Sequence, residues 1–318
     1  MTKESLRIVY MGTPDFAVES LRALVEGGYN VVAVITMPDK PIGRHGSQLQ
    51  PSPVKIYAME HGLNIMQPAN LKDPDFVEQL RALHADLQIV VAFRMLPKVV
   101  WQMPPLGTFN AHASLLPKYR GAAPINWAVI NGEKETGVTT FFLKHEIDTG
   151  DIIQQVKIGI SDTDNAETVH DKLMALSGQL VIETVDNIIA GTVKSMPQDC
   201  ITGVEPTPAP KIFRETCRID WNQTSEQLHN FVRGLSPYPA AWTTLNGKSV
   251  KITEASPMPD SRSAAEPGTL ATDHKTYLRA ATADGWLDIH ALQIEGKKRM
   301  ATADLLRGFK IEEGSRFE

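Results

Sequence analysis

Three polar side chains in two short stretches have the types and spacing needed for chemistry at a carbonyl carbon. Asn110 and His112 stand two residues apart, and Asp148 follows 36 residues after the histidine. An amide and an imidazole can donate hydrogen bonds to an oxygen that gains negative charge, and a carboxylate can orient the imidazole and favour its charged form. Because we identify no Cys or Ser as a nucleophile, we expect direct acyl transfer between two bound substrates, without a covalent enzyme intermediate.

Alternating strand and helix patterns surround these residues. Short apolar runs that are typical of buried parallel strands occupy residues 6–11, 31–35 and 87–92. Helical spacing of apolar residues follows the first run at 16–25 and precedes the third at 76–83. This βαβα order predicts an α/β fold with a Rossmann-like, doubly wound, mostly parallel sheet.

The predicted sheet explains how the polar residues could share one site. A short strand at residues 107–109 would deliver Asn110 and His112 to the carboxyl edge of the sheet, where ligands bind in such folds. Residues two apart in extended chain point the same way, so both would face one pocket. Asp148 lies in a turn after a further strand predicted at 138–143.

The turn after the first strand argues against a dinucleotide-binding oxidoreductase. It has the sequence Gly-Thr-Pro-Asp-Phe over residues 12–16, which lacks the GxGxxG pattern that cradles a pyrophosphate. Proline at the expected helix start favours a plain strand-to-helix turn instead.

The chain changes character in its last third. A long amphipathic helix is predicted at residues 166–190, and a Pro-rich extended linker occupies 194–210. One helix at 225–235 is then followed by short alternating segments with turn residues between them, which predicts a small OB-like β-barrel. We therefore expect a catalytic domain over 1–193 and a C-terminal domain over 211–318.

Composition limits the class of protein further. The 318 residues are 42% hydrophobic and 22% charged, with a net charge of −5, and no apolar run approaches the ~18 residues of a membrane span. Without a signal-peptide pattern, and with only Cys200 and Cys217, the chain is expected to be cytoplasmic, with reduced thiols, no metal site and no membrane association.

The pattern Asn-x-His-x-Ser-Leu-Leu-Pro-x-Tyr-Arg-Gly at residues 110–121, followed by Asp-Thr-Gly-Asp at 148–151, resembles the signature of the folate-dependent formyltransferases. Matches to this family cover nearly the whole chain and include residues 120–125, 136–139, 219–221, 233–239 and 293–298. Two departures are visible. Arg94 follows Phe93 where the family often has glycine, a difference that would bear on the wall of the folate pocket, and Glu146-Ile147 stands where glycine-leucine is common.

The resemblance implies a reaction and roles for the three polar residues. The formyl group of 10-formyltetrahydrofolate, a co-substrate, would pass to the methionine amine of charged initiator tRNA at the start of bacterial-type translation. The amine would attack the formyl carbon and form a tetrahedral oxyanion intermediate. Asn110 and His112 would donate to the oxyanion, and Asp148 would pair with His112 and help to move a proton from the amine. One amine and one folate meeting in one pocket make a monomer the default expectation.

The same resemblance implies a folate-binding segment. Ser114, Leu115, Leu116 and Pro117 match the family's folate-contacting residues, and the two leucines are apolar enough to line a pterin site. The alternative is that Leu-Leu-Pro simply packs a loop.

Two basic regions are candidates for contact with tRNA. Residues 38–51 are too rich in Pro, Gly and polar side chains to predict helix or strand. The corresponding loop in the family inserts into the tRNA acceptor arm, so Arg44 would be its main contact and Lys40 would assist; a solvated surface loop is the alternative. Lys211 begins the C-terminal domain, whose basic residues we assign to tRNA binding as a group. The assignment of single residues within this group is provisional. Besides Lys211, the group includes Arg214, Arg218, Arg233, Lys248, Lys251 and residues 297–299.

Other functions remain open at this point. A formyltransferase for a nucleotide-linked amino sugar or for glycinamide ribonucleotide would share the three polar residues, although the purine-pathway enzyme resembles only the first domain. A non-catalytic tRNA-binding protein would not need the intact Asn, His and Asp. A formyl-folate hydrolase would leave the second domain unexplained.

Overall fold

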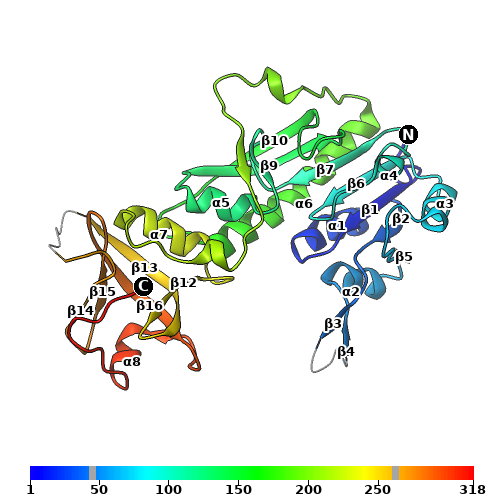
Figure 1. Ribbon diagram of the computed structural model, residues 1–318. Helices are drawn as coiled ribbons and strands as arrows, with labels where there is room; N and C mark the ends of the chain where they lie inside the picture. The colour runs from blue at the N-terminus through cyan, green and yellow to red at the C-terminus, as the bar shows by residue number, and fades with distance from the viewer. Residues whose placement is uncertain (43–47, 260–264) are drawn as a thin grey trace. The chain divides into compact units, whose positions relative to one another are not determined.

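The computed structural model describes residues 1–42, 48–259 and 265–318 (Figure 1). The chain forms two compact units, each assembled from more than one stretch of sequence. Unit 1 contains residues 1–121, 136–158 and 170–208, and unit 2 contains residues 122–135, 159–169 and 209–318. Two segments from the predicted catalytic domain thus belong to the C-terminal unit. The expected domain boundaries at residues 193 and 210 concern domains that fold independently, and they stay a prediction.

Unit 1 is built on a seven-stranded sheet with the order β10-β9-β7-β6-β1-β2-β5. Its strands are β1 (Ile8–Gly12), β2 (Val31–Ile35), β5 (Ile65–Met66), β6 (Leu87–Val91), β7 (Thr108–His112), β9 (Glu135–Phe142) and β10 (Ile152–Gly159). The pairs β1–β2, β1–β6, β2–β5 and β6–β7 are parallel, whereas β7–β9 is antiparallel. This arrangement confirms the predicted Rossmann-like, mostly parallel sheet.

Helices connect these strands. They are α1 (Phe16–Glu26), α2 (Pro53–Glu60), α3 (Pro74–Ala82), α4 (Lys98–Trp101) and α6 (Ala166–Ala190), with α5 (Pro124–Ile130) assigned to unit 2. Three of them, α1, α3 and α6, are the helices predicted at 16–25, 76–83 and 166–190. The turn into α1 requires glycine, because a Cβ on Gly12 would lie only 2.6 Å from the Cβ of Ala17. Asp73 caps α3 by accepting hydrogen bonds from the N–H groups of Asp75 and Phe76.

Helix α6 is long and apolar enough, by length and composition, to cross a membrane, and it is the one such helix among the described residues. Its small polar side chains nevertheless pack inside the protein. The hydroxyl of Ser177 lies 3.2 Å from that of Ser20 on α1, and the hydroxyl of Thr184 lies 2.9 Å from that of Thr140 on β9. These contacts are those of a core helix that covers the sheet.

The basic segment 38–51 contains a hairpin, so the prediction that it has neither helix nor strand is wrong. Strands β3 (Lys40–Ile42) and β4 (Gln48–Gln50) pair antiparallel, with Lys40 opposite Gln50. A two-stranded ribbon has only edge strands, and an edge strand tolerates Pro41 because the missing N–H can face away from the partner.

Unit 2 combines α7 (Ser225–Gly234) with an antiparallel sheet of order β12-β13-β16-β15-β14, and β17 pairs with β16. The strands are β12 (Ala241–Leu245), β13 (Lys248–Pro259), β14 (Leu270–Thr272), β15 (Leu278–Ala281), β16 (Gly285–Ile294) and β17 (Met300–Ala301). The core includes Trp221 stacked on Phe317, with ring centroids 5.3 Å apart. The predicted helix and antiparallel strands are confirmed, and closure into an OB-like barrel stays a prediction.

Candidate active site

Strand β7 carries two of the three polar residues. Asn110 stands opposite Val90 of β6, and His112 stands opposite Thr139 of β9. Alternate residues of a strand share a face, so the two side chains project from the same side of the sheet. The imidazole is buried, with 8% of His112 exposed.

The turn after β9 brings Asp148 to the histidine. Its Oδ2 lies 3.9 Å from His112 Nδ1 and accepts a hydrogen bond of 2.9 Å from the backbone N–H of Gly121. Asp148 has φ +54°, a left-handed conformation that Asp adopts more readily than most residues. Thus segments separated by more than 25 residues converge on one carboxylate.

One nitrogen of the histidine ring is held by a hydrogen bond, and the other faces a carboxylate. Nε2 lies 2.8 Å from the carbonyl oxygen of Tyr119, and because a carbonyl only accepts, Nε2 carries the proton. Nδ1 then faces Asp148, so a proton taken up at Nδ1 would sit beside a carboxylate. Donation from His112 to a substrate oxygen would require its Nε2–H to be shared with, or released from, Tyr119.

The side-chain oxygen of Asn110 is a polar atom of the site without a hydrogen-bond partner in the described part of the chain. This Oδ1 atom is buried. Buried polar atoms in proteins are nearly always paired, so this oxygen leaves an acceptor that a ligand or a water can pair. An amide can donate through Nδ2 and accept through Oδ1, which suits both a carbonyl oxygen and an amine.

Gln198 supports the Asp148 turn and is a functional residue that sequence reasoning missed. Its Nε2 donates to the carbonyls of Asp148 and Gly150, at 2.8 and 2.9 Å. Its Oε1 accepts from Arg120 Nε and Nη2, at 3.1 and 2.6 Å. Arg120 stands in the recognised motif, but a single glutamine inside the predicted linker carries no local signal.

The predicted folate segment is largely committed to contacts within the protein. The Ser114 hydroxyl donates to the carbonyl of Lys118, and the Ser114 carbonyl accepts from the Thr139 hydroxyl. Leu116 is 2% exposed and packs with Phe141 and Ile152. These contacts agree with the packed-loop alternative for Ser114 and Leu116.

The other two residues of the folate segment differ in burial. Pro117 is buried, whereas Leu115 is half-buried. Of the four, Leu115 is therefore the one whose side chain can contact a ligand without first leaving the core.

The basic hairpin begins at an anchored residue. Asp39 forms an ion pair with Lys55 at 2.6 Å and accepts from Gln67 Nε2 at 2.8 Å. The Lys55 ammonium beside it holds the pKa of Asp39 below its usual value. Lys40 follows and is exposed on β3, whereas Arg44 lies outside the described residues.

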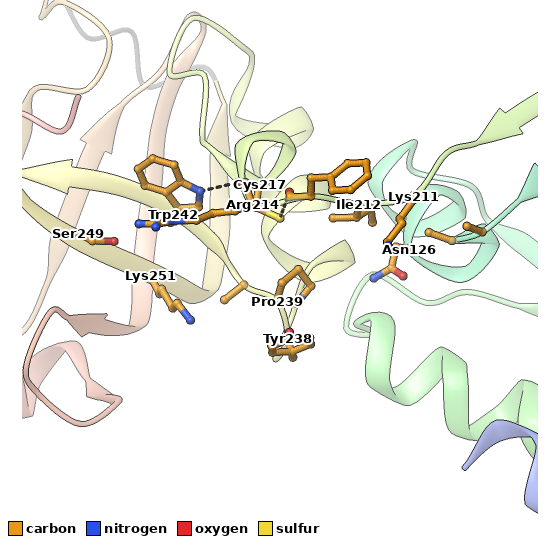
Figure 2. A pocket seen from close by; sticks show the side chains of 14 residues that line it. Asn126, Lys211, Ile212, Arg214, Cys217, Tyr238, Pro239, Trp242, Ser249 and Lys251 are labelled. Carbon is orange, nitrogen blue, oxygen red and sulfur yellow. Dashed lines mark hydrogen bonds between the residues drawn. The ribbon is translucent and has the colours of Figure 1, made fainter. Parts of the chain in front are cut away.

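Lys211 lines a cavity of about 610 Å³ within unit 2 (Figure 2). Lys251 and Arg214 line the same cavity, and no Asp or Glu stands among its described lining residues. Arg233 does not join this group and its provisional assignment to tRNA binding is wrong, because it is 6% exposed. Its guanidinium donates inward to the carbonyls of Ser161 and Asp164.

The cysteines and the acidic residues form no second candidate site in the part of the chain that the structure describes. Both cysteines are free, as expected, and burial raises the pKa of the Cys217 thiol, which keeps it protonated. Within the described ranges, no cluster of three or more His, Cys, Asp or Glu residues is arranged to hold a metal ion.

Comparison with known proteins identifies relatives over the whole chain. Residues 6–185 match the model of the formyl transferase family, and residues 211–310 match the formyl transferase C-terminal domain. The methionyl-tRNA formyltransferase of Bacteroides fragilis is 64% identical over 98% of both chains, and that of Porphyromonas gingivalis is 48% identical over 98% of both.

Solved structures with the same fold are more distant. The sugar 3N-formyl transferase WlaRD has a TM-score of 0.66 and 21% identity, covering 92% of this chain and 99% of that one. HypX from Aquifex aeolicus in complex with tetrahydrofolic acid has a TM-score of 0.63 and 20% identity, covering 97% of this chain and 49% of that one. At these identities the likeness concerns the fold alone.

Proposed function

The chain belongs to the formyl transferase family, and we propose that it transfers the formyl group of 10-formyltetrahydrofolate to the free amine of methionyl-initiator tRNA. The observation that carries this proposal is the 64% identity to a methionyl-tRNA formyltransferase over 98% of both chains, which includes both units. A purine-pathway acceptor would leave unit 2 without a role.

The residues of the site fit a folate-borne formyl group. The side-chain amide of Asn110, whose Oδ1 has no partner among the described residues, can offer its Nδ2 as a donor to the formyl oxygen, and the half-buried Leu115 offers an apolar contact for the pterin. We assign folate binding to residues 114–117, with the hydroxyl of Ser114 and the side chain of Leu116 supporting the segment from inside. When bound, the folate supplies the electrophilic formyl carbon.

Each polar residue then has a defined task. As the amine attacks, Asn110 Nδ2 donates to the formyl oxygen, where negative charge accumulates in a tetrahedral oxyanion. His112 takes up the proton lost by the amine at Nδ1, where Asp148 stabilises the imidazolium from 3.9 Å. His112 then returns this proton to the folate nitrogen as the carbon–nitrogen bond to the folate breaks, so that the carbonyl re-forms on the new amide and tetrahydrofolate leaves. The bond between Tyr119 and Nε2 keeps the ring in this orientation.

The acceptor is bound by basic residues outside the catalytic group. We assign Lys40 and Arg44 to the acceptor arm of the tRNA and Lys211 to its backbone. The 15 Lys and Arg residues against 14 Asp and Glu in residues 211–318 give this region a net charge of +1, whereas the rest of the chain carries −6. We further propose a monomer that acts in the cytoplasm, where charged tRNA is used, and that needs no metal.

One assay tests the reaction directly. Labelled 10-formyltetrahydrofolate is supplied with methionyl-initiator tRNA and, in parallel, with an amino-sugar nucleotide, each with and without EDTA. We expect label on the tRNA alone, and EDTA without effect. Label on the sugar alone would keep the three polar residues in their roles and overturn the assignment of the acceptor.

A further inference from the structure

Tyr238 is an aromatic side chain that is exposed to solvent on unit 2. It is 82% exposed, and it makes no hydrogen bond or ring contact with any described residue. The other aromatic residues of the same cavity are already engaged: Lys211 Nζ lies 5.4 Å from the ring centroid of Phe213, and the Arg214 guanidinium lies 5.2 Å from that of Trp242. The ring of Tyr238 is therefore largely available to a ligand.

The backbone around Tyr238 is anchored. Ser236 donates its hydroxyl to the carbonyls of Val232 and Thr253, at 2.8 and 2.7 Å, and the N–H of Ala240 bonds to the carbonyl of Leu235 at 2.9 Å. Prolines 237 and 239 flank the tyrosine and restrict φ on both sides. A ring held out on a stiff, anchored segment loses little entropy when a ligand stacks on it.

Cations surround the cavity beside this ring. In Figure 2, Tyr238 lies below the opening, with Lys251 on one side and Lys211 on the other. Lys251 has no ion-pair partner among the described residues, and Arg218 adds a further charge 5.7 Å from the Trp242 ring centroid. With no carboxylate in the described lining, the cavity favours a polyanion.

We propose that this cavity is a subsite for an unpaired nucleotide of the tRNA, whose base stacks on Tyr238 while the adjoining phosphates lie against Lys251 and Lys211. The inference rests on the proposed function for its occupant. A volume of about 610 Å³ falls in the ~300–1,000 Å³ range of small-ligand sites and is ample for one nucleotide. Stacking requires an exposed base face, which a base inside a duplex does not offer.

Binding of a short RNA by the full-length chain tests the stacking. The probe is a single-stranded tetranucleotide that contains 2-aminopurine, and the same strand in a duplex is the control. Tyr238→Ala is expected to weaken single-strand binding roughly 5- to 150-fold, the range of one base–aromatic stack. Tyr238→Phe, which keeps the ring and loses only the hydroxyl, is expected to remain within twofold of the wild type.

Salt dependence tests the phosphate contacts separately. Losing one phosphate contact to single-stranded RNA flattens the slope of log K against log salt by about 0.7, which we expect for Lys251→Gln. Lys275→Gln is the matched control, since Lys275 is exposed on the same unit but does not line the cavity. An unchanged slope in Lys251→Gln, or an equal change in the control, contradicts the phosphate assignment.

The outcomes separate this inference from the proposed function. Formylation of tRNA by the wild type, with Tyr238→Ala binding the tetranucleotide normally, overturns the subsite alone. Ring-dependent RNA binding without any tRNA formylation overturns the proposed function alone. A polyglutamate peptide that binds as tightly as the RNA and displaces it would assign the cavity to an acidic peptide and overturn the subsite.

Discussion

Replacing Asp148 by asparagine separates the charge of this carboxylate from its structural role. An Asn side chain still offers an oxygen to the N–H of Gly121, and it tolerates the φ of +54° at this position. The stability of the protein should therefore change by less than ~1 kcal/mol. The negative charge 3.9 Å from His112 Nδ1 is lost, however, so uptake of a proton by the ring is no longer assisted.

The two Asp148 variants should differ in stability but not in the size of their loss of activity. Loss of general acid–base assistance typically costs about 10²–10⁴ in turnover, and we expect kcat of Asp148→Asn to fall within this range. Asp148→Ala should lose as much activity and in addition unfold more readily. It leaves the Gly121 N–H without its charged acceptor, at about 1.5–3 kcal/mol, and places alanine in a left-handed conformation, at about 1–2 kcal/mol.

The measurement pairs single-turnover formyl transfer with thermal unfolding of the two variants. The expected pattern is two slow enzymes, of which only Asp148→Ala has a lowered Tm. Turnover of Asp148→Asn within threefold of the wild type would refute the role of the charge. A large loss of Tm in Asp148→Asn would show instead that the carboxylate is chiefly structural.

Three further substitutions test the surroundings of the site. Asn110→Ala should lower kcat about 10²–10³-fold, because it removes a donor to the oxyanion. Its Tm should be unchanged or slightly raised, because the amide that it removes has a buried oxygen without a partner among the described residues. A fall of Tm by several degrees would contradict this account. Gln198 is 4% exposed and joins the Asp148 turn to Arg120. Gln198→Ala should therefore lower the free energy of unfolding, measured by urea titration, by about 2–3 kcal/mol, and it should lower kcat without changing the KM for tRNA. An unchanged kcat would contradict the positioning role of Gln198. Asp39→Asn should lower Tm at neutral pH, because it removes the ion pair with Lys55. The difference in Tm from the wild type should vanish only as the pH falls below 3.8 and through the depressed pKa of Asp39, where the wild-type carboxylate is itself protonated. A difference in Tm that persists in acid would show that the ion pair is not the cause.

The predicted elements that proved correct are those with a strong local pattern. The strand predicted at 31–35 is β2, the strand predicted at 87–92 contains β6, and the helix predicted at 166–190 is α6. The strands are short, mostly apolar runs, and the buried side chains of α6 recur every three or four residues, so each pattern is visible in neighbouring residues. The hairpin of β3 and β4 lacks such a pattern, because its described residues are exposed on both strands.

The site itself divides in the same way. Asn110 and His112 follow from the sequence because one strand holds both, and two residues along a strand always share a face. The motif could also name Asp148, but only the folded chain shows that its partner is the N–H of Gly121 and that Gln198 supports its turn.

The opposite fates of two basic residues make the same distinction. Arg233 and Lys251 are both basic residues of the C-terminal region, and the sequence does not show which of them is exposed. In the structure Arg233 is buried and its guanidinium donates inward, whereas Lys251 lines an open cavity. The sequence by itself determined the order of strands and helices and the chemical groups available for catalysis, because these depend on neighbouring residues. Only the tertiary structure decided which distant groups meet and which charges remain exposed, because hydrogen bonding and burial depend on distances through space that no local period encodes.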